Sequence, residues 1–123
     1  MLVVDDNPAN QKLARVILEA EGYIVRTVTD GEQALASVHE DPPSAILMDI
    51  QLPGMDGLEV TRRLKSDRAT RAIAIVAVTA YAMKGDRERA LAAGCDGYIS
   101  KPIDPLTLPR QVAAYIAAVS GTA

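Results

Sequence analysis

Acidic, basic and hydroxyl side chains follow several of the short apolar runs in this sequence. Asp5 and Asp6 come after "MLVV", and Asp49 comes after "SAILM". Thr79 closes "AIAIVAVT", and Lys101 follows "DGYIS". Three carboxylates brought close together repel one another strongly, so either a proton is trapped or a cation is bound among them. Because the ligand atoms are all oxygens, the expected cation is a hard one, Mg²⁺ or Mn²⁺.

This combination of groups suits a phosphoryl group. Phosphoryl transfer asks a protein mainly for positioning and charge neutralisation, which a metal ion, an ammonium group and a hydroxyl can provide. A carboxylate can itself act as the nucleophile and form an aspartyl-phosphate. The predicted nucleophile is Asp49, between the metal ion and Lys101. The glycine-containing loop "QLPGMDG" lets the backbone approach the ion, and the carbonyl of Gln51 is a predicted ligand.

Five short apolar runs alternate with five segments of helical periodicity, and these elements must position the groups above. Because the runs are short and mostly rich in Val or Ile, we expect strands at 1–5, 23–28, 44–49, 72–79 and 96–100. Between and after them we expect helices at about 13–20, 32–39, 58–64, 84–93 and 108–119. The first helix is predicted from the helical spacing of Leu13, Val16, Ile17 and Ala20.

The alternation of strands and helices predicts an α/β domain with a parallel sheet and right-handed crossovers. Three of the strands are apolar nearly throughout, as is typical of strands that helices cover on both faces. In such sheets, ligands bind beyond the carboxyl ends of the strands, where the strand order reverses. With the strand order 2-1-3-4-5, the first and third strands are neighbours, so Asp5, Asp6 and Asp49 would converge.

Length, charge and cysteine content argue against several classes of protein. A chain of 123 residues is long enough for one domain and too short for two. A net charge of −3 argues against nucleic-acid binding, which calls for a basic face. No apolar run approaches the roughly 18–20 residues that cross a bilayer, and the N-terminus lacks the basic region of a signal peptide. Cys95 is the only cysteine, so an internal disulfide is impossible and a cytoplasmic location is expected.

Four motifs occur together along the chain: "VVDDN", "LMDIQLPGMDG", "VAVTAYAMKGD" and "GCDGYISKPI". In this order and at this spacing they resemble the receiver domain of two-component response regulators, over nearly the whole chain. The resemblance implies a flavodoxin-like (βα)5 fold of three layers, with a parallel five-stranded sheet in the order 2-1-3-4-5. It also implies that Asp49 accepts a phosphoryl group from a histidine kinase or a histidine phosphotransfer protein. The chain would then be a signalling switch, with no separate substrate to turn over.

The resemblance further implies how the metal ion is bound. Asp6 and Asp49 would bind Mg²⁺ directly, together with the carbonyl of Gln51, and Asp5 would bind it largely through water. Judged alone, Asp5 and Asp6 have a simpler interpretation as caps of the first helix, because Asp is a common N-cap before an early proline. One residue could serve both roles.

Other residues match the phosphate contacts and the switch of the family. Thr79 and Lys101 match the hydroxyl and the lysine that contact the phosphate, and Tyr98 matches the switch aromatic. The Lys101–Pro102 peptide bond is expected to be cis. When Thr79 moves toward the phosphoryl group, Tyr98 is expected to turn inward and repack the face formed by the fourth helix, the fifth strand and the fifth helix. A downstream protein would bind that face.

Within the family, "MDIQLP" and "AVTAYAMKGD" are most similar to stand-alone receivers, whereas "GDRERALAAG" is also typical of receivers fused to hybrid histidine kinases. We expect a receiver domain at 1–119 and a short tail at 120–123, without an output domain. Output would then occur through contact with another protein, and neither a nucleic acid nor a membrane is expected as a partner.

Two other functions fit parts of the same pattern. A phosphohydrolase of the haloacid dehalogenase type also uses an aspartate nucleophile with Mg²⁺. Its general acid is a second Asp two residues later, where this chain has Gln51. A receiver-shaped binding module that works without phosphorylation is the other alternative. The complete set of acidic and phosphate-facing residues speaks against it.

Several residues that could carry chemistry have simpler interpretations. His39 is the only histidine, and we expect it at the surface near the end of the second helix. Cys95 is expected to be a small packed residue rather than a reactive thiol. Gly54 and Gly57 are expected to form turns.

Overall fold

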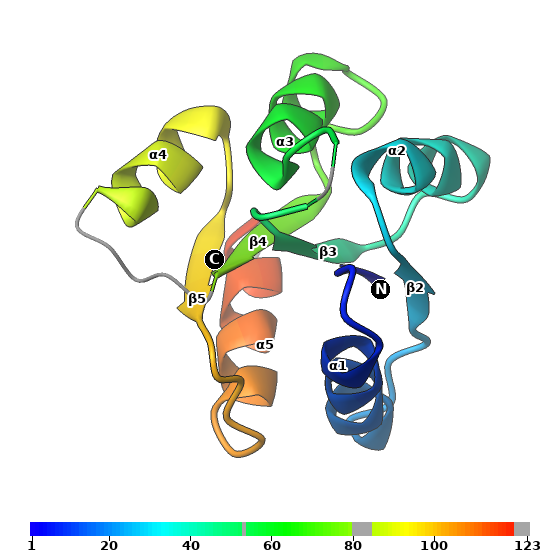
Figure 1. The fold of residues 1–123 in the computed structure, drawn as a ribbon, viewed down its shortest axis with the longest axis vertical. Helices are drawn as coiled ribbons and strands as arrows, with labels where there is room; N and C mark the ends of the chain where they lie inside the picture. The colour runs from blue at the N-terminus through cyan, green and yellow to red at the C-terminus, as the bar shows by residue number, and fades with distance from the viewer. Residues whose placement is uncertain (53, 80–84, 120–123) are drawn as a thin grey trace.

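The structure is a computed structural model that describes residues 1–52, 54–79 and 85–119. Strands and helices alternate strictly along the chain, as the sequence predicts (Figure 1). The strands are β1 (Leu2–Val4), β2 (Arg26–Val28), β3 (Ala45–Asp49), β4 (Ala74–Thr79) and β5 (Gly97–Ser100). The helices are α1 (Pro8–Ala20), α2 (Gly31–Glu40), α3 (Gly57–Ser66), α4 (Asp86–Ala93) and α5 (Leu108–Val119).

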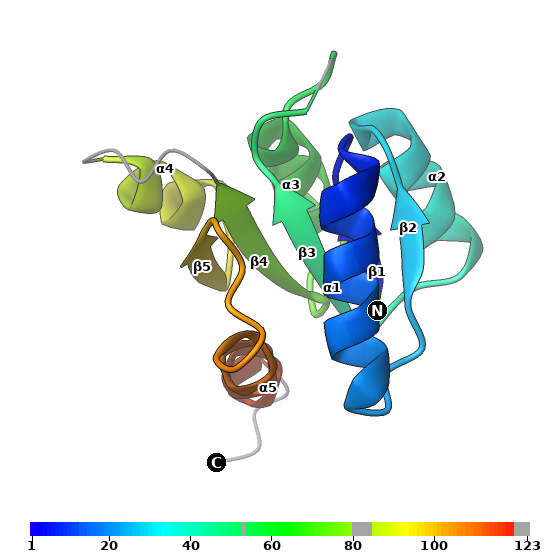
Figure 2. The same ribbon diagram turned by 60° about the horizontal axis from the view of Figure 1, so that its bottom comes forward.

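The five strands form one parallel sheet in the order β2-β1-β3-β4-β5, which confirms the predicted flavodoxin-like topology. Helices α1 and α5 cover one face of the sheet, and α2, α3 and α4 cover the other (Figures 1 and 2). The strand order reverses between β1 and β3, which pair directly and place their carboxyl ends side by side. This edge is where a parallel α/β sheet binds its ligands.

Side chains alternate between two hydrophobic cores, one on each face of the sheet. In β3, Ile46 and Met48 belong to the core under α2, α3 and α4, whereas Ala45 and Leu47 belong to the core under α1 and α5. This is the period of two that a pleated strand imposes. The strands β1, β3 and β4 are buried throughout because both of their faces are covered, whereas the edge strand β2 is half-buried.

The first helix and the second strand differ in detail from expectation. The helix forms, but its buried residues are Ala14, Ile17 and Leu18, and the side chains of Leu13 and Val16 are exposed. The apolar spacing therefore predicted the helix correctly but placed its buried face one residue out of register. The small Ala14 is buried in the core under α1 and α5. The strand begins at Arg26 instead of residue 23, and Ile24 before it is 84% exposed.

Two predictions concern residues that lie outside the described ranges. The fourth helix was expected from Lys84, which lies outside them; the described helix begins at Asp86 after Gly85, whose φ is +101°. The expected tail at 120–123 also lies outside the described residues. None of the described helices combines the length and the apolar composition that a bilayer-spanning segment needs.

Candidate functional site

Three carboxylates meet at the carboxyl edge of the sheet. One oxygen from each of Asp5, Asp6 and Asp49 lies within 4.8 Å of the others. Asp49 is the last residue of β3, and Asp5 follows β1 directly. Because β1 and β3 pair in parallel, with Val4 opposite Met48, the residues that follow them leave the sheet at the same point. The structure thus brings together the three acids that the sequence places at the ends of two different strands.

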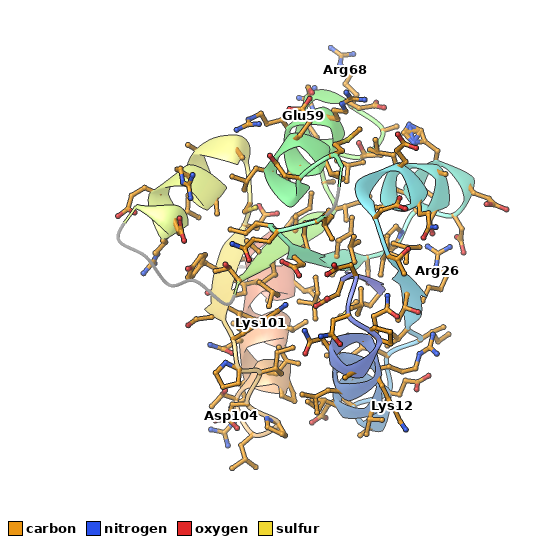
Figure 3. The ribbon with its side chains drawn as sticks, in the orientation of Figure 1. Lys12, Arg26, Glu59, Arg68, Lys101 and Asp104 are labelled. Atoms are coloured by element: carbon orange, nitrogen blue, oxygen red, sulfur yellow. The ribbon has the colours of Figure 1, made fainter. Side chains whose placement is uncertain are left out.

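Lys101 lies against this acidic cluster. Its Nζ donates to Asp5 Oδ2 and to Asp49 Oδ2, each at 3.1 Å. The backbone places it there, because the Lys101 N–H donates to the carbonyl of Thr79 at 2.7 Å. The Lys101–Pro102 peptide bond is cis, as expected. In Figure 3, Lys101 lies near the middle of the molecule, whereas the cations Lys12 and Arg26 lie toward its rim.

The charges in this cluster do not balance. Three carboxylates and one ammonium leave a formal charge of −2, with Asp5 and Asp49 buried and Asp6 exposed. Burial raises the pKa of Asp49, and the charge of Asp5 adds to this effect, while hydrogen bonds from Gln51 and Lys101 oppose it. Burial alone would lower the pKa of Lys101, but Asp49 and Asp5 outweigh it, so the pKa is raised and the ammonium stays charged. The oxygen donors and the residual charge of −2 both fit a divalent hard cation.

The loop after β3 fixes the orientation of Asp49. The backbone N–H of Gln51 donates to Asp49 Oδ1 at 2.9 Å, while Oδ2 accepts from Lys101, so both oxygens of the carboxylate are held. Gln51 itself is exposed at this edge of the sheet. Gly54 has a φ of +74°, as expected for a turn. Gly57 is not a turn residue: it begins α3, and a Cβ there would overlap the carbonyl oxygen of Asp49.

The first helix is capped by Asn7, so the interpretation of Asp5 or Asp6 as its N-cap is wrong. Asn7 Oδ1 accepts from the N–H groups of Ala9 and Asn10, and Pro8 occupies the first helical position. Asp5 Oδ1 instead accepts the N–H of Asn7 at 2.9 Å, in a turn that directs the carboxylate toward the site. Neither Asp5 nor Asp6 caps the helix, so both carboxylates are available to the acidic cluster.

The two predicted switch residues lie on one face of the sheet. Thr79 ends β4 and is fully buried. Tyr98 pairs with Ala77, two residues before Thr79, and it packs on the core under α2, α3 and α4. Because residues two apart on a strand point to the same face, the side chains of Thr79 and Tyr98 both point toward this core. Burial raises the pKa of Tyr98, and the charges of Asp86 and Glu88 on α4 raise it further.

The expectations for His39 and Cys95 are confirmed. His39 is exposed on the last turn of α2, where it hydrogen bonds to the carbonyl of Leu35. Cys95 is buried, its Sγ lies 3.7 Å from Thr61 Oγ1, and burial raises the pKa of its thiol. A raised pKa keeps a thiol protonated and inert at neutral pH, so Cys95 is a packing residue.

Comparison with known proteins gives one consistent result. The family model of the response regulator receiver domain matches residues 1–113. The polar-differentiation response regulator DivK of Brucella ovis is 47% identical over 116 residues, which cover 94% of each chain. A putative response regulator from Chloroflexus aurantiacus superposes with a TM-score of 0.91 at 30% identity, covering 94% of this chain and 95% of that one.

A second structure bears on the metal. The receiver domain of the sensor histidine kinase PA1611 from Pseudomonas aeruginosa superposes with a TM-score of 0.86 at 40% identity, covering 94% of this chain and 95% of that one. That structure is described with a magnesium ion coordinated in its active-site cleft. None of these matches is a phosphohydrolase of the haloacid dehalogenase type. The chain belongs to the receiver domains of two-component response regulators, which are signalling switches activated by phosphorylation.

Proposed function

We propose that Asp49 is the phosphoacceptor of this receiver, and that a phosphohistidine of a histidine kinase or a histidine phosphotransfer protein is the donor. The observation that carries the proposal is the arrangement around Asp49. One carboxylate oxygen is oriented by the Gln51 N–H, the other contacts Lys101, and two further acids lie beside it. A nucleophile held in this way is positioned before the donor arrives, which is the main requirement of phosphoryl transfer.

Asp5, Asp6, Asp49 and the carbonyl of Gln51 would hold Mg²⁺ or Mn²⁺. When bound, such an ion supplies positive charge that neutralises the carboxylates and the oxygens of the phosphoryl group. The residual charge of −2 and the oxygen-only donor set support this assignment, as does the magnesium ion in the related receiver of PA1611.

In the transfer, a carboxylate oxygen of Asp49 forms a bond to phosphorus while the bond from phosphorus to the imidazole nitrogen breaks. Lys101 already donates to Asp49, and its ammonium group can pair with an oxygen of the new phosphoryl group. Leu13 and Val16 on α1 are exposed apolar side chains on the helix that follows the acidic loop. They offer contact area for the protein that carries the phosphohistidine.

The phosphoryl group carries about −1.5 to −2 charges next to Lys101 and Thr79, and these replace the single charge of the Asp49 carboxylate. Thr79 would donate its hydroxyl to the phosphoryl group, and Tyr98 on the same face would turn inward into the space that Thr79 leaves. The α5 residue Tyr115 donates from its hydroxyl to the carbonyl of Tyr98 at 3.4 Å, so a change at β5 reaches α5 directly. A downstream protein would bind the altered surface of α4, β5 and α5.

This function takes place in the cytoplasm and involves no separate substrate. The receiver would catalyse its own phosphorylation and slow dephosphorylation, and it would signal through protein contact. Residues 1–119 form the receiver in this proposal, and 120–123 are a tail.

Incubation with acetyl phosphate and MgCl₂ tests the assignment of Asp49. We expect the wild-type chain to gain one phosphoryl group, measured by intact mass, and Asp49→Asn to gain none. Asp30→Asn is the matched control, because Asp30 caps α2 and Asn is an equally good cap. A wild-type chain that stays unmodified with both acetyl phosphate and a phosphorylated histidine kinase would reject the proposal.

A further inference from the structure

The loop between β1 and α1 carries two of the three acids, and their repulsion from Asp49 tends to push it away from the sheet. The backbone of Asp5 extends the pairing of β1 with β2, because its N–H donates to the carbonyl of Val28 at 3.1 Å. β2 ends at Val28, so no residue of that strand follows to pair with the carbonyl of Asp5.

The side chain of Gln11 supplies the missing donor. Its Nε2 donates to the carbonyl of Asp5 at 2.6 Å and to the carbonyl of Val28 at 3.0 Å. Both partners are carbonyl oxygens, so the amide nitrogen, and not the amide oxygen, must face them. The backbone N–H of Gln11 also donates to the carbonyl of Asn7 at 3.1 Å. That bond is the first helical bond of α1 and does not depend on the side chain, so the side-chain amide of Gln11 is what holds the Asp5 end of the loop.

The position of this segment determines where the carboxylates lie. Asp5 Oδ1 accepts the N–H of Asn7, and Asp5 Oδ2 accepts from Lys101. Both contacts require the backbone of Asp5 to stay at the end of the sheet. Asp6 is exposed, and it follows Asp5 on the same short loop. A cation that must first order its ligands binds more weakly than one that meets ligands already in place.

We infer that Gln11 is a positioning residue for the divalent cation: by holding the acidic loop against β2, it presets Asp5 and Asp6 and strengthens the binding of Mg²⁺. The inference rests on the proposed function, because it takes the acidic cluster to be the metal site. Gln11 is uncharged and its Nε2 faces backbone carbonyls, so it acts through the loop and not as a ligand or a charge.

The test compares Gln11→Met with the wild-type chain. Methionine has a similar length but no donor, so the substitution removes both contacts of Nε2 with little change in volume. The matched control is Gln33→Met, because Gln33 Oε1 also makes two contacts at 3.0 Å, with the N–H and the hydroxyl of Thr29, and these involve neither the loop 5–7 nor its acids. Calorimetric titration with MgCl₂ alone gives the affinity, and thermal unfolding gives the stability.

We expect Gln11→Met to bind Mg²⁺ about tenfold more weakly, at the lower end of the effect of outer-shell partners of metal ligands. Gln33→Met should bind as the wild type does. Amide hydrogen exchange at Asn7, whose N–H depends on the loop, should be faster in Gln11→Met than in Gln33→Met. A merely structural role would lower the melting temperature without changing the Mg²⁺ affinity of the folded protein.

The outcomes separate this inference from the proposed function. Equal Mg²⁺ affinity of Gln11→Met and the wild type overturns the inference and leaves the proposed function intact. The same holds if Gln33→Met weakens binding as much as Gln11→Met does. A wild-type chain that does not bind Mg²⁺ overturns both. If Gln11→Met does not fold, Gln11→Asn decides, because its shorter amide keeps the polarity but cannot reach both carbonyls.

Discussion

Two half-buried lysines, Lys101 and Lys65, lie at opposite edges of the sheet. Lys101, at the carboxyl edge, contacts Asp5 and Asp49 and has Asp6 nearby. Lys65, in the last turn of α3, lies at the amino edge and contacts Asp96, which directly precedes β5. The side chains of the two lysines are equally buried, at 16% and 17% exposure. Burial therefore does not distinguish the two sites.

The difference lies in the balance of charges and hydrogen bonds. The three donors of Lys65 meet the carboxylate of Asp96 at 2.7 Å, the carbonyl of Ile73 at 2.8 Å and the carbonyl of Arg71 at 3.0 Å. Asp96 also accepts the N–H of Ile75 at 2.8 Å. This pair is neutral and satisfied, so it joins α3, β4 and β5 without a need for a further ligand. The cluster at Lys101 has a formal charge of −2, and this imbalance is what a bound cation would relieve.

The largest expected effect is on the rate of phosphorylation, which should depend on Lys101 and not on Lys65. Lys101→Met should slow phosphorylation by acetyl phosphate about 100-fold, the usual cost of removing one group that stabilises charge in a transition state. Lys65→Met should leave the rate unchanged, because Lys65 lies at the far edge of the sheet. Initial rates measured by intact mass at a temperature where both variants are folded would check this. Similar rates for both variants would contradict the functional difference between the two edges.

The two substitutions should also differ in how Mg²⁺ affects stability. Lys65→Met should lower the free energy of unfolding by about 3 kcal/mol, because it leaves the Asp96 carboxylate and two carbonyls without their partner. MgCl₂ should not reduce this loss. Lys101→Met should be destabilised in metal-free buffer, and MgCl₂ should reduce its loss by about 1 kcal/mol, since removal of a positive charge strengthens cation binding. Urea unfolding with and without MgCl₂ measures both differences. If Mg²⁺ restored the free energy of unfolding of Lys65→Met, the conclusion that the Lys65 site needs no cation would be wrong.

A smaller effect is expected at Gly94, which ends α4 beside the stem of Lys65. Its φ is +109°, and an added Cβ would lie 2.8 Å from Lys65 Cγ. Gly94→Ala should therefore cost about 2 kcal/mol, from backbone strain and from displacement of Lys65. Gly22→Ala is the control, because Gly22 has a φ of +94° but nothing within 4 Å of its Cβ position. It should cost about 1 kcal/mol. If both variants lost the same free energy of unfolding in urea, the side chain of Lys65 would move away from the added Cβ at no cost.

The smallest effect concerns the ionisation of Asp49 in the metal-free protein. Burial raises the pKa of Asp49 above its ordinary value of 3.8, so the folded state holds this proton more tightly than the unfolded state. The contribution of Asp49 therefore favours folding at acidic pH and is lost as the pH rises from 3.8 through the folded pKa. Asp49→Asn should be more stable than the wild type by about 1 kcal/mol at pH 7, a typical size for one substitution.

The difference between Asp49→Asn and the wild type should disappear as the pH falls below 3.8, where the carboxyl is protonated in both states. Unfolding by urea over a series of pH values in the presence of a chelator measures it. The substitution Asp96→Asn, at the opposite edge, should destabilise at pH 7, because it removes the partner of Lys65. If Asp49→Asn and Asp96→Asn both stabilised the protein, the two ends of the sheet would not differ in their balance of charges.

Local patterns in the sequence determined most of the fold and the composition of the site. Short runs rich in Val and Ile indicated the buried strands, because a strand covered on both faces must be apolar throughout. Their alternation with helices implied a parallel sheet, and a parallel sheet places Asp5, Asp49 and Lys101 at one edge. These conclusions needed only neighbouring residues and the rules of chain connection.

The tertiary structure decided which contacts these residues make. Lys101 and Asp5 are 96 residues apart, and nothing local predicts that they meet at 3.1 Å while Lys65 meets Asp96. The same holds for the contact of Gln11 with the end of β2, and for the exposure of Leu13. Sequence periodicity specifies that a helix is amphipathic, but the rotation of that helix on the sheet depends on how side chains from distant segments fill the space between them. For that reason the pattern identified the chemical groups, and only packing defined their partners.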